Sequence, residues 1–387
     1  MNIAILIPEL GGGGAERVAT IIGNYFSEKG ENVYYFIGDY KVKQLRPVKG
    51  TVIQTGIKRL TGNPVKEMIK LIFAALKIRG LKKQYDIDIS ISFMEYFNFL
   101  NVLSRTKDRV FVRVCTILSK RDDLPETIIY SKKMINFLYN RADKVVVMTK
   151  FAENEMTEEY GIKREKISII PNPIAPDYTE DGEEEWIYGD KAVICVGRPD
   201  YIKQYHVAIR AFSKAAEKIP DAKLVIIGQG RENKKLQELV LALNLEDKVF
   251  LPGFRENVMW YLKKAKVFLM TSKVEGFPNS MIEAMAAGVP IVSIDSFGAP
   301  AEILGGKSGV TKIEYCPYGI LTPNVLNAKI DALDLLQEEE ILGEALTKLL
   351  SDSEMLRKYS EAAKRRAKEY EIEQIMGIWN QYFEKKI

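Results

Sequence analysis

The stretch Glu275-Gly-Phe-Pro-Asn-Ser-Met-Ile-Glu283, continuing as Ala-Met-Ala-Ala-Gly288-Val-Pro290, indicates a turn that leads from a strand into a helix. The apolar run 267–271 before it is typical of a short buried strand. Asn279 or Ser280 is suited to cap the helix and Gly288 to end it. A strand–turn–helix–strand unit places its loop at the carboxyl end of a parallel sheet, where α/β proteins bind ligands. The N–H groups at the start of such a helix favour an anion such as phosphate.

Two glutamates bracket this turn, and each also has a plain structural interpretation. Ser280 and Glu283 have the spacing of a capping box, and Glu275 could be an ordinary loop carboxylate. A second stretch, Gly197-Arg198-Pro-Asp-Tyr-Ile-Lys203, follows the apolar strand 191–196. A basic pair of this kind is often surface charge, but an arginine fork and a lysine point charge also bind phosphate oxygens. Because both stretches follow strands of one predicted domain, we interpret them together as a candidate phosphate-binding site.

Strand-like and helix-like segments alternate along the chain, which predicts α/β domains with doubly wound parallel sheets. The first half has predicted strands at 2–7, 33–37, 52–55, 87–93, 110–115, 144–148 and 167–170. The second half has predicted strands at 191–196, 222–227, 248–251, 266–271 and 290–294. An acidic linker at 179–185 separates the halves, and residues from Leu336 onward are mostly of helical pattern. A chain of 387 residues is long enough for two domains, which we place at 1–172 and 186–370.

Composition excludes several classes of protein. Apolar residues make up 47% and charged residues 28% of the chain, which is typical of a folded soluble protein. No apolar run approaches the roughly 18 residues that a membrane span requires, and residues 2–7 read as a strand rather than a signal peptide. The isolated Cys115, Cys195 and Cys316 suit a reducing cytoplasm. The single histidine, His206, excludes a His-rich metal site, and its helical surroundings predict a surface or packing role.

Residues 41–83 form a strongly basic stretch, with twelve lysines and arginines against one acid, Glu67. Apolar residues recur within it at helical spacing, at Val65, Met68, Ile69, Ile72, Phe73 and Leu76. One interpretation is a helix that packs on the core and has a solvated basic face. The other is a surface that docks on an anionic membrane. Nucleic acid is not an expected partner, because aromatic residues are not interleaved with the basic ones and no recognition motif follows.

Two further motifs have the form of ligand sites. Gly11-Gly-Gly-Gly14 joins the first predicted strand to a helix and allows a ligand to approach the backbone closely, although the spacing matches neither a Walker loop nor Gly-x-Gly-x-x-Gly. Asp86-Ile-Asp88 spells the D-x-D of metal-dependent transferases. It stands at the entry of a strand rather than after its carboxyl end, so we expect no metal there.

The Glu275 stretch closely resembles the Glu-x7-Glu signature of the retaining nucleotide-sugar transferases of glycosyltransferase family 4. The Arg198 stretch is similar to the family's Gly-Arg-x4-Lys, and Gly13-Gly-Ala-Glu-Arg17 is similar to its N-terminal domain. This resemblance implies the GT-B fold, in which two Rossmann-like domains face a central cleft. It also implies that residues 1–172 bind the acceptor, that residues 186–370 bind the donor, and that the last helix, about 371–387, packs back on the first domain.

The resemblance assigns roles to particular residues. Arg198 and Lys203 would grip the donor diphosphate, Glu283 would bind the ribose, and Glu275 would bind and position the donor sugar. The implied catalytic residues are Glu275, Arg198 and Lys203. The implied donor-binding residues are Gly13, Gly14, Arg198, Lys203, Phe254, Glu275, Gly276, Phe277, Pro278, Asn279, Ser280 and Glu283. No metal is implied, and front-face transfer assisted by the leaving phosphate is favoured over the two-carboxylate route of retaining hydrolases.

The sequence departs from the family on the acceptor side. Many members carry a histidine after the fourth or fifth strand of the first domain, whereas residues 110–122 contain none. We expect its role to fall to Arg113 or Thr116, and we expect Glu95 and Asn98 to lie on an acceptor-side loop.

The resulting hypothesis is a retaining glycosyltransferase that moves a hexose or N-acetylhexosamine from a UDP-sugar to a polyprenyl-diphosphate-linked glycan. Such an enzyme would need no cofactor or metal beyond its nucleotide-sugar co-substrate. The stretch 41–83 would hold it, as a cytoplasmic peripheral protein, on the inner face of the cell membrane. The alternatives are a nucleotide-sugar 2-epimerase on the same fold and a non-catalytic module that binds a nucleotide-sugar or a membrane.

Overall fold

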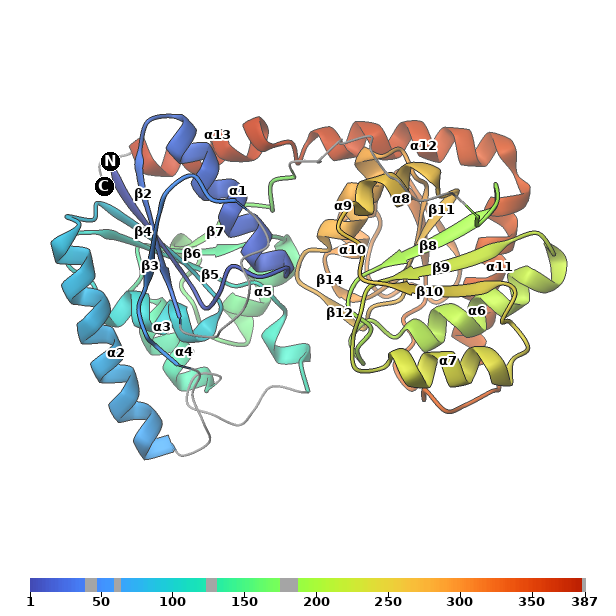
Figure 1. Ribbon diagram of the computed structural model, residues 1–387, viewed down its shortest axis with the longest axis horizontal. Coiled ribbons are helices and arrows are strands. Elements are labelled where there is room, and N and C mark those ends of the chain that lie inside the picture. The colour runs from blue at the N-terminus through green and yellow to red at the C-terminus, as the bar shows by residue number, and fades with distance from the viewer. Residues whose placement is uncertain (39–46, 59–63, 123–130, 175–186, 385–387) are drawn as a thin grey trace. The chain divides into compact units, whose positions relative to one another are not determined.

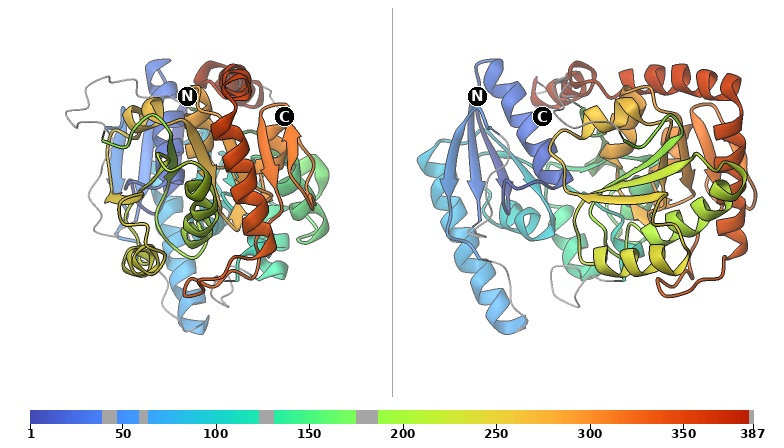
Figure 2. Two further views of the ribbon diagram at one scale, coloured as in Figure 1. Left: turned by 90° about the vertical axis from the view of Figure 1, so that its right-hand side faces the viewer. Right: turned by 45° about the vertical axis from the view of Figure 1, so that its right-hand side comes forward.

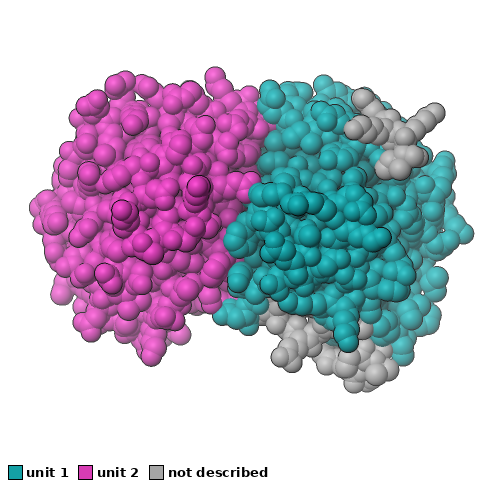
Figure 3. Space-filling view, turned by 180° about the vertical axis from the view of Figure 1, so that it is seen from behind, with its two compact units in different colours: residues 1–174, 372–387 teal, residues 175–371 magenta. Residues whose placement is uncertain are grey.

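The computed structural model describes residues 1–38, 47–58, 64–122, 131–174 and 187–384 (Figure 1). The chain divides into two compact units, coloured separately in Figure 3. Unit 1 comprises residues 1–174 and 372–387, and unit 2 comprises residues 175–371. Each unit has its own sheet and is described by itself. The predicted linker at 179–185 lies outside the described residues.

The sheet of unit 1 has seven strands in the order β3-β2-β1-β4-β5-β6-β7, and every described pairing is parallel. Its strands are β1 (Asn2–Ile7), β2 (Asn32–Ile37), β3 (Thr51–Gln54), β4 (Ile89–Phe93), β5 (Arg109–Arg113), β6 (Lys144–Val147) and β7 (Ile167–Ile169). The interiors of strands β1, β4 and β5 consist of apolar or small residues because helices cover both faces of the sheet. The carboxyl ends of the central strands β1, β4 and β5 therefore meet at one edge of the unit.

Six helices of the described residues belong to unit 1. They are α1 (Gly14–Glu28), α2 (Pro64–Gln84), α3 (Glu95–Leu103), α4 (Lys132–Tyr139), α5 (Lys150–Glu158) and α13 (Ile372–Glu384). Helices α1 and α13 lie on one face of the sheet, and α2 and α3 lie on the other (Figures 1 and 2). None of the described helices is long and apolar enough to cross a bilayer.

Helix α13 packs on unit 1 through aromatic side chains, although the helix before it along the chain belongs to unit 2. Trp379 is fully buried, with its ring centroid 5.9 Å from that of Phe111 and 5.8 Å from that of Phe383. Phe383 stacks on Phe26 of α1 at 4.8 Å. These contacts cover the α1 face of the sheet, so the last helix completes the core of unit 1.

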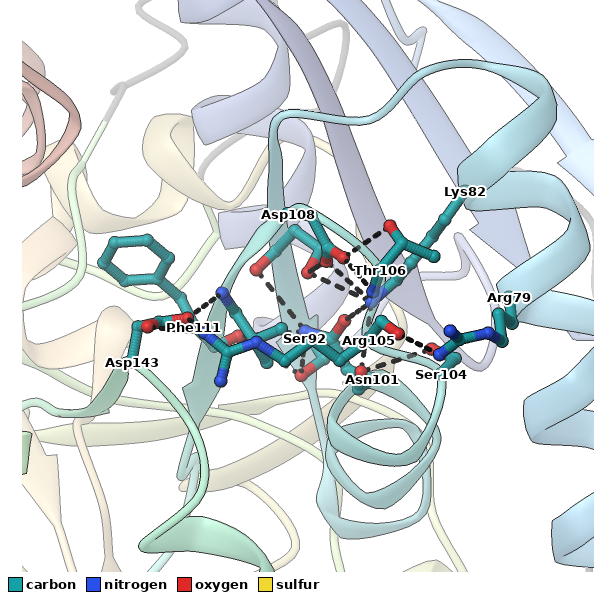
Figure 4. A network of polar contacts seen from close by, with 12 residues as sticks. Arg79, Lys82, Ser92, Asn101, Ser104, Arg105, Thr106, Asp108, Phe111 and Asp143 are labelled. Carbon is teal, nitrogen blue, oxygen red and sulfur yellow. Dashed lines mark hydrogen bonds and ion pairs between the residues drawn. The ribbon is translucent and has the colours of Figure 1, made fainter. Parts of the chain in front are cut away.

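A buried polar network fixes α2 to the sheet at the amino ends of β4 and β5 (Figure 4). The Nζ of Lys82 lies 2.8 Å from Oδ2 of Asp108, and both side chains have no exposed surface. Lys82 also donates to Oδ1 of Asn101 at 2.7 Å, and Oγ of Ser90 donates to Asp108 at 2.6 Å. Burial lowers the pKa of Lys82 to about 8, and the charge of Asp108 opposes that shift. The D-x-D motif lies at the same amino edge of the sheet, away from the carboxyl ends of the strands.

The sheet of unit 2 also has seven strands, in the order β10-β9-β8-β11-β13-β16-β15. They are β8 (Ala192–Val196), β9 (Lys223–Ile227), β10 (Val249–Gly253), β11 (Val267–Met270), β13 (Ile291–Ile294), β15 (Glu314–Cys316) and β16 (Gly319–Thr322). All described pairings are parallel except that of β15 with β16. The sequence analysis did not predict β15 and β16, which are only three and four residues long. A short parallel pair, β12 (Val274–Glu275) with β14 (Phe297–Gly298), forms a separate two-stranded sheet.

The helices of unit 2 cover both faces of this sheet. They are α6 (Tyr205–Lys218), α7 (Asn233–Ala242), α8 (Val258–Lys264), α9 (Asn279–Ala286), α10 (Pro300–Leu304), α11 (Gln337–Ser351) and α12 (Ser353–Lys368). His206 of α6 is buried, so of the two predicted roles it has the packing one. The two units confirm the predicted class of two Rossmann-like α/β domains, and the predicted cleft between them stays a prediction.

Candidate functional site

The loop after β8 is held tightly by close backbone approach. Gly197 has φ of 153°, and a Cβ atom there would lie 2.8 Å from the hydroxyl of Tyr205. A Cβ at Gly228, at the end of β9, would lie 1.9 Å from the carbonyl oxygen of Gly197. Only glycine fits these two positions, so the loops after β8 and β9 are pressed together at the carboxyl end of the sheet.

Asp200 organises the basic residues of this loop. One of its carboxylate oxygens accepts the N–H groups of Ile202 and Lys203 at 3.1 and 3.2 Å, which fixes the turn. The other oxygen accepts from Nε of Arg198 at 3.3 Å. The Arg198 side chain remains 77% exposed, so its guanidinium can still meet a ligand. The sequence analysis missed Asp200, although it occupies an unassigned position of the Gly-Arg-x4-Lys pattern.

The loops after β8 and β11 are joined to each other by three hydrogen bonds. The N–H of Lys273 donates to the carbonyl of Ile202 at 2.7 Å, and Oγ1 of Thr271 donates to the carbonyl of Lys203 at 2.9 Å. The Nζ of Lys203 lies 2.5 Å from Oε1 of Glu275, with side chains 23% and 11% exposed. The structure thus brings together two residues that the sequence analysis singled out 72 positions apart.

The backbone of Glu275 is fixed as well as its side chain. Val274 and Glu275 pair with Phe297 and Gly298 in the β12–β14 ladder. The N–H of Ala299 donates to the carbonyl of Glu275 at 3.0 Å. Glu275 therefore presents its carboxylate from a rigid turn.

Helix α9 begins directly after this turn, one residue earlier than predicted. Pro278 occupies the cap position, and its φ of −80° is already suited to a helix start. No side chain makes a cap hydrogen bond, so the prediction that Asn279 or Ser280 caps the helix is wrong. The two residues instead lie in the first turn, where the N–H groups and the positive end of the helix dipole favour an anion.

The remaining predicted donor residues of unit 2 occupy the carboxyl-end loops with different exposure. Gly276, Phe277 and Pro278 are buried, and the ring of Phe277 packs edge-on against Tyr370 at 5.4 Å. Glu283 is buried in α9. Phe254, after β10, is half exposed, which leaves its ring accessible. Gly276, Phe277 and Pro278 therefore shape the loop, whereas the ring of Phe254 is accessible to a ligand.

Four of the predicted residues of unit 1 lie just after the carboxyl ends of its strands, in loops or at helix starts: Gly13, Gly14, Glu95 and Thr116. Gly13 and Gly14 stand where α1 begins, and their contact with a donor stays a prediction. Thr116 is half-buried after β5. Glu95 begins α3 and is 6% exposed, and its Oε1 has no hydrogen-bond partner among the described residues. Burial raises the pKa of Glu95 to about 7.

Asn98 and Arg113 require a correction, because both are buried inside unit 1. The amide of Asn98 donates to the carbonyl of Arg113 at 2.9 Å and to the hydroxyl of Tyr139 at 3.0 Å. The guanidinium of Arg113 donates to Oδ1 of Asn172 at 2.5 Å and lies over the rings of Phe93 and Trp379. With 0% and 1% exposure, neither side chain can reach an acceptor, and their role is structural.

Cys115 is the other reactive residue type near Glu95, and the sequence analysis gave it no role. Burial raises the pKa of its thiol to about 12, and the charges of Glu95 and Glu16 act in the same direction. The thiol is therefore protonated and is not a nucleophile at neutral pH.

The family profile described as Glycosyltransferase Family 4 matches residues 12–178, and the profile described as Glycosyl transferases group 1 matches residues 179–315. An uncharacterised glycosyltransferase of Methanocaldococcus jannaschii is 30% identical over 347 residues, which are 82% of this chain and 84% of that protein. A second relative, from Campylobacter jejuni, is 28% identical over 379 residues, or 96% of each chain. Its name is N-acetylgalactosamine-N,N'-diacetylbacillosaminyl-diphospho-undecaprenol 4-alpha-N-acetylgalactosaminyltransferase.

Solved structures share the fold over almost the whole chain. Sucrose-phosphate synthase of Thermosynechococcus elongatus has a TM-score of 0.77 at 17% identity, and HepE of Anabaena in complex with UDP has 0.75 at 16%; each comparison covers 99% of both chains. At these identities the likeness concerns the fold alone. The family profiles, the M. jannaschii relative and the two parallel sheets agree: the chain belongs to glycosyltransferase family 4, with the GT-B fold, and is a glycosyltransferase of polysaccharide or glycan biosynthesis.

Proposed function

We propose that this chain transfers a hexose or N-acetylhexosamine from a UDP-sugar to a hydroxyl of a polyprenyl-diphosphate-linked glycan, with retention of anomeric configuration. The observation that carries the proposal is the 2.5 Å contact between Lys203 and Glu275. It joins the basic loop after β8 to the acidic loop after β11, beside the N-terminus of α9. A diphosphate and the sugar attached to it require these two kinds of group side by side.

The chemistry follows from the charges that develop during transfer. The bond between the anomeric carbon and the phosphate oxygen breaks, so positive charge grows on the sugar and negative charge on the leaving diphosphate. Arg198, Lys203 and the N-terminus of α9 would stabilise the diphosphate from positions fixed before reaction. Glu275 would hold the sugar hydroxyls, because its backbone and side chain are both anchored.

Retention is best explained by attack from the face that the diphosphate leaves. The acceptor oxygen bonds to the anomeric carbon, and its proton passes to the departing phosphate oxygen. The two-carboxylate route would need a free carboxylate nucleophile, whereas the Glu275 carboxylate is paired with Lys203. We propose that the reaction uses no metal ion, since Arg198, Lys203 and the positive end of the α9 dipole would together offset the charge of the diphosphate.

The acceptor proposal rests on the C. jejuni relative, whose name specifies a diphospho-undecaprenol-linked glycan. Glu95 and Thr116 are the residues that we propose for the acceptor side, because both lie at the carboxyl edge of the unit 1 sheet. Glu95 has a carboxylate oxygen without a partner among the described residues, which suits it to accept a bond from a sugar hydroxyl.

The lipid-linked acceptor makes an association with the membrane useful, and α2 supports one. Its residues Ile69, Ile72, Phe73 and Leu76 are 50–68% exposed, and at 100° per residue they form one stripe along the helix. The opposite face, with Leu71 and Ile78, is buried. Exposed lysines at 70, 77 and 83 stand beside or in line with the stripe. We propose that this stripe enters the headgroup region of the anionic inner face of the cell membrane, which makes the enzyme a cytoplasmic peripheral protein.

Calorimetric titration with nucleoside diphosphates and their sugars, in EDTA, tests the donor proposal. We expect UDP and a UDP-sugar to bind without metal. Arg198→Ala and Lys203→Ala should each weaken binding about tenfold or more, because each removes a charged bond to phosphate. Lys218→Ala, on an exposed end of α6, is the control and should bind as the parent does. Absence of nucleotide binding, or binding that both site variants leave unchanged, would contradict the proposal.

A further inference from the structure

Unit 2 contains a pocket of about 470 Å³ at the carboxyl ends of β13 and β16. It lies between the loop 308–311, the segment after β16 and the first turns of α11. This volume is in the range of small-molecule sites. Arg198, Lys203 and Glu275 are not among the residues that line it, although Phe297 of the lining belongs to the strand that pairs with β12, so the pocket adjoins the site described above and is distinct from it.

Asp295 supplies the first polar group of the pocket. It follows β13 and is 8% exposed. Its Oδ2 accepts the N–H groups of Gly309 and Val310, at 2.5 and 3.3 Å, and so holds the loop 308–311 in place. Its Oδ1 has no hydrogen-bond partner among the described residues. A buried carboxylate oxygen without a partner is costly, and this one is placed where a ligand could satisfy it.

Asn324 supplies a second polar group from the segment after β16. Both the oxygen and the nitrogen of its amide are shielded from solvent, and neither has a partner among the described residues. An amide offers one acceptor and two donor hydrogens, whereas a carboxylate only accepts. The pocket therefore presents both kinds of hydrogen-bonding group from two different strand ends.

The rest of the lining decides the class of ligand. The described lining residues include no lysine, arginine or histidine, and Glu338 adds another acid, so an anion such as phosphate is disfavoured. The described residues contain no group of three His, Cys, Asp or Glu side chains that could hold a metal ion. Phe297, Leu326 and Ile341 provide apolar surface. A neutral pyranose matches this lining, because it has hydroxyls that both donate and accept and an apolar ring face.

The wall of the pocket is fixed before any ligand arrives. The segment after β16 is bonded to α6: Nε2 of Gln204 donates to the carbonyl of Val325 at 3.1 Å. Arg210 donates to the carbonyl of Lys329 at 2.9 Å and pairs with Glu339 at 2.7 Å, with both charged side chains buried. A preformed wall lowers the entropic cost of binding.

We propose that this pocket is a second carbohydrate site, which binds one neutral pyranose through Asp295 and Asn324. It does not depend on the donor proposal, because the two sites share none of Arg198, Lys203 and Glu275. An enzyme that handles glycans could use it to hold a sugar residue of an acceptor or product away from the reacting bond.

The test uses the full chain and the methyl α-glycosides of glucose, galactose, N-acetylglucosamine and N-acetylgalactosamine. Binding of each glycoside is followed by saturation-transfer NMR in the presence of saturating UDP. It is measured again without UDP in the Lys203→Ala variant, in which the proposed donor site is impaired. The result therefore does not depend on whether the donor proposal is right. At least one glycoside should bind saturably, with a dissociation constant on the order of 1 mM. Asp295→Asn keeps an oxygen for the loop 308–311 and replaces the free acceptor by a donor; it should weaken binding about tenfold or more. Asn324→Ala should do the same.

Asp331→Asn and Asn327→Ala are the matched controls, since both residues are exposed in the same segment and neither lines the pocket. They should bind the glycoside as the parent does, and all four variants should keep the parent's melting temperature within a few degrees. The proposal would be overturned if no glycoside bound saturably, if UDP displaced the glycoside, or if Asp295→Asn and Asn324→Ala bound as tightly as the controls. Asp295→Asn or Asn324→Ala could lose both its melting transition and its binding. In that case Asn324→Asp is measured, because it keeps the shape of the amide and removes only its donor. A folded Asn324→Asp that binds as the parent does would overturn the proposal.

Discussion

Glu275 and Lys203 each limit where the other can lie. Their 2.5 Å contact is mostly shielded from water, and the backbone of each is bonded to a neighbouring loop. A partly buried pair of this kind is stronger than an exposed one, because solvent screens it less. The proposed roles, phosphate for Lys203 and a sugar hydroxyl for Glu275, are compatible with this arrangement.

Glu275→Gln keeps the shape of the side chain and removes its charge. We expect turnover to fall about 100-fold or more, because the sugar would no longer be held against the reacting bond. UDP affinity should change little, since the proposed diphosphate contacts are those of Arg198, Lys203 and α9. Steady-state transfer rates and UDP titration measure the two effects separately, with Glu238→Gln on the exposed face of α7 as the control. Full activity of Glu275→Gln would remove its proposed role.

Glu95 gives a prediction about stability and pH. Its pKa is about 7 in the folded protein and near 4.5 when unfolded, so between these values the folded state binds a proton that the unfolded state lacks. The contribution of Glu95 to the free energy of unfolding therefore falls as pH rises through this window, by up to about 3 kcal/mol. Glu95→Gln carries no charge in either state and should lack this dependence.

The free energy of unfolding of Glu95→Gln, compared with that of the parent at the same pH, should accordingly increase between about pH 5 and about pH 8. Hydrogen exchange of the β4 and β5 amides reports it for unit 1 alone. Glu158→Gln, at an exposed position of α5, is the control and should follow the parent at every pH. If the parent and Glu95→Gln lost protection in parallel across this range, Glu95 would not have a raised pKa.

At single residues the sequence analysis placed Lys203 and Glu275 in one candidate site, and the structure brings their side chains into contact, whereas their roles stay predictions. It failed for Asn98 and Arg113, which are polar residues of an apparently ligand-facing region. The sequence could not show that Asn98 bonds to Tyr139, 41 positions away, or that Arg113 bonds to Asn172, 59 positions away. Asp295 and Asn324 were missed for the same reason, since they meet only when β13 and β16 lie side by side.

Among the elements, α2 differs most from an ordinary core helix. The apolar residues that recur at helical spacing were expected either to pack on the core or to meet a membrane. Ile69, Ile72, Phe73 and Leu76 prove to be exposed, whereas Leu71, Ala74, Ala75 and Ile78 are buried. Periodicity alone could not decide between the two faces, because both carry apolar side chains. Lys41, Lys43, Arg46 and Arg59 of the basic stretch lie outside the described residues, as does the side chain of Lys66.

Replacing Lys70, Lys77 and Lys83 together by Gln should weaken binding to phosphatidylglycerol vesicles on the order of 100-fold, at about 1 kcal/mol per lysine. Phe73→Ser should also weaken it, through lost apolar burial, without a loss of stability because the ring is 68% exposed. Vesicle sedimentation measures both. A triple Gln variant at Lys218, Lys234 and Lys235 of unit 2 carries the same change in charge and should bind as the parent does. Equal binding by the parent and the α2 variants would exclude the proposed surface.

At the scale of the whole molecule, the chain forms unit 1 first and unit 2 next, and its last helix, α13, belongs to unit 1 again. The alternation of patterns predicted two doubly wound sheets, with boundaries within a few residues for most strands, but it predicted neither the strand order nor β15 and β16. The family resemblance, rather than the pattern of α13 itself, gave the expectation that the last helix returns to unit 1. An amphipathic helix shows which face it buries but not against which sheet.

Trp379→Ala tests the independence of the two units. It removes a fully buried ring between Phe111 and Phe383, which should cost unit 1 about 3–5 kcal/mol. UDP affinity should remain close to that of the parent, because every proposed diphosphate contact except Gly13 and Gly14 is in unit 2. Hydrogen exchange of β5 and UDP titration follow the two units, with Gln381→Ala on the exposed face of α13 as the control. Loss of protection in unit 2 as well would show that the units do not fold independently.

The most direct test of the central claim is the anomeric configuration of the product made from an α-linked UDP-sugar and a synthetic polyprenyl-diphosphate glycan in EDTA. NMR of the product should show a new α-linkage, formed by the parent and reduced about 100-fold or more in Glu275→Gln. A β-linkage would contradict retention. Conversion of the donor without any acceptor would indicate an epimerase, and binding of the donor with no conversion would leave only a binding module.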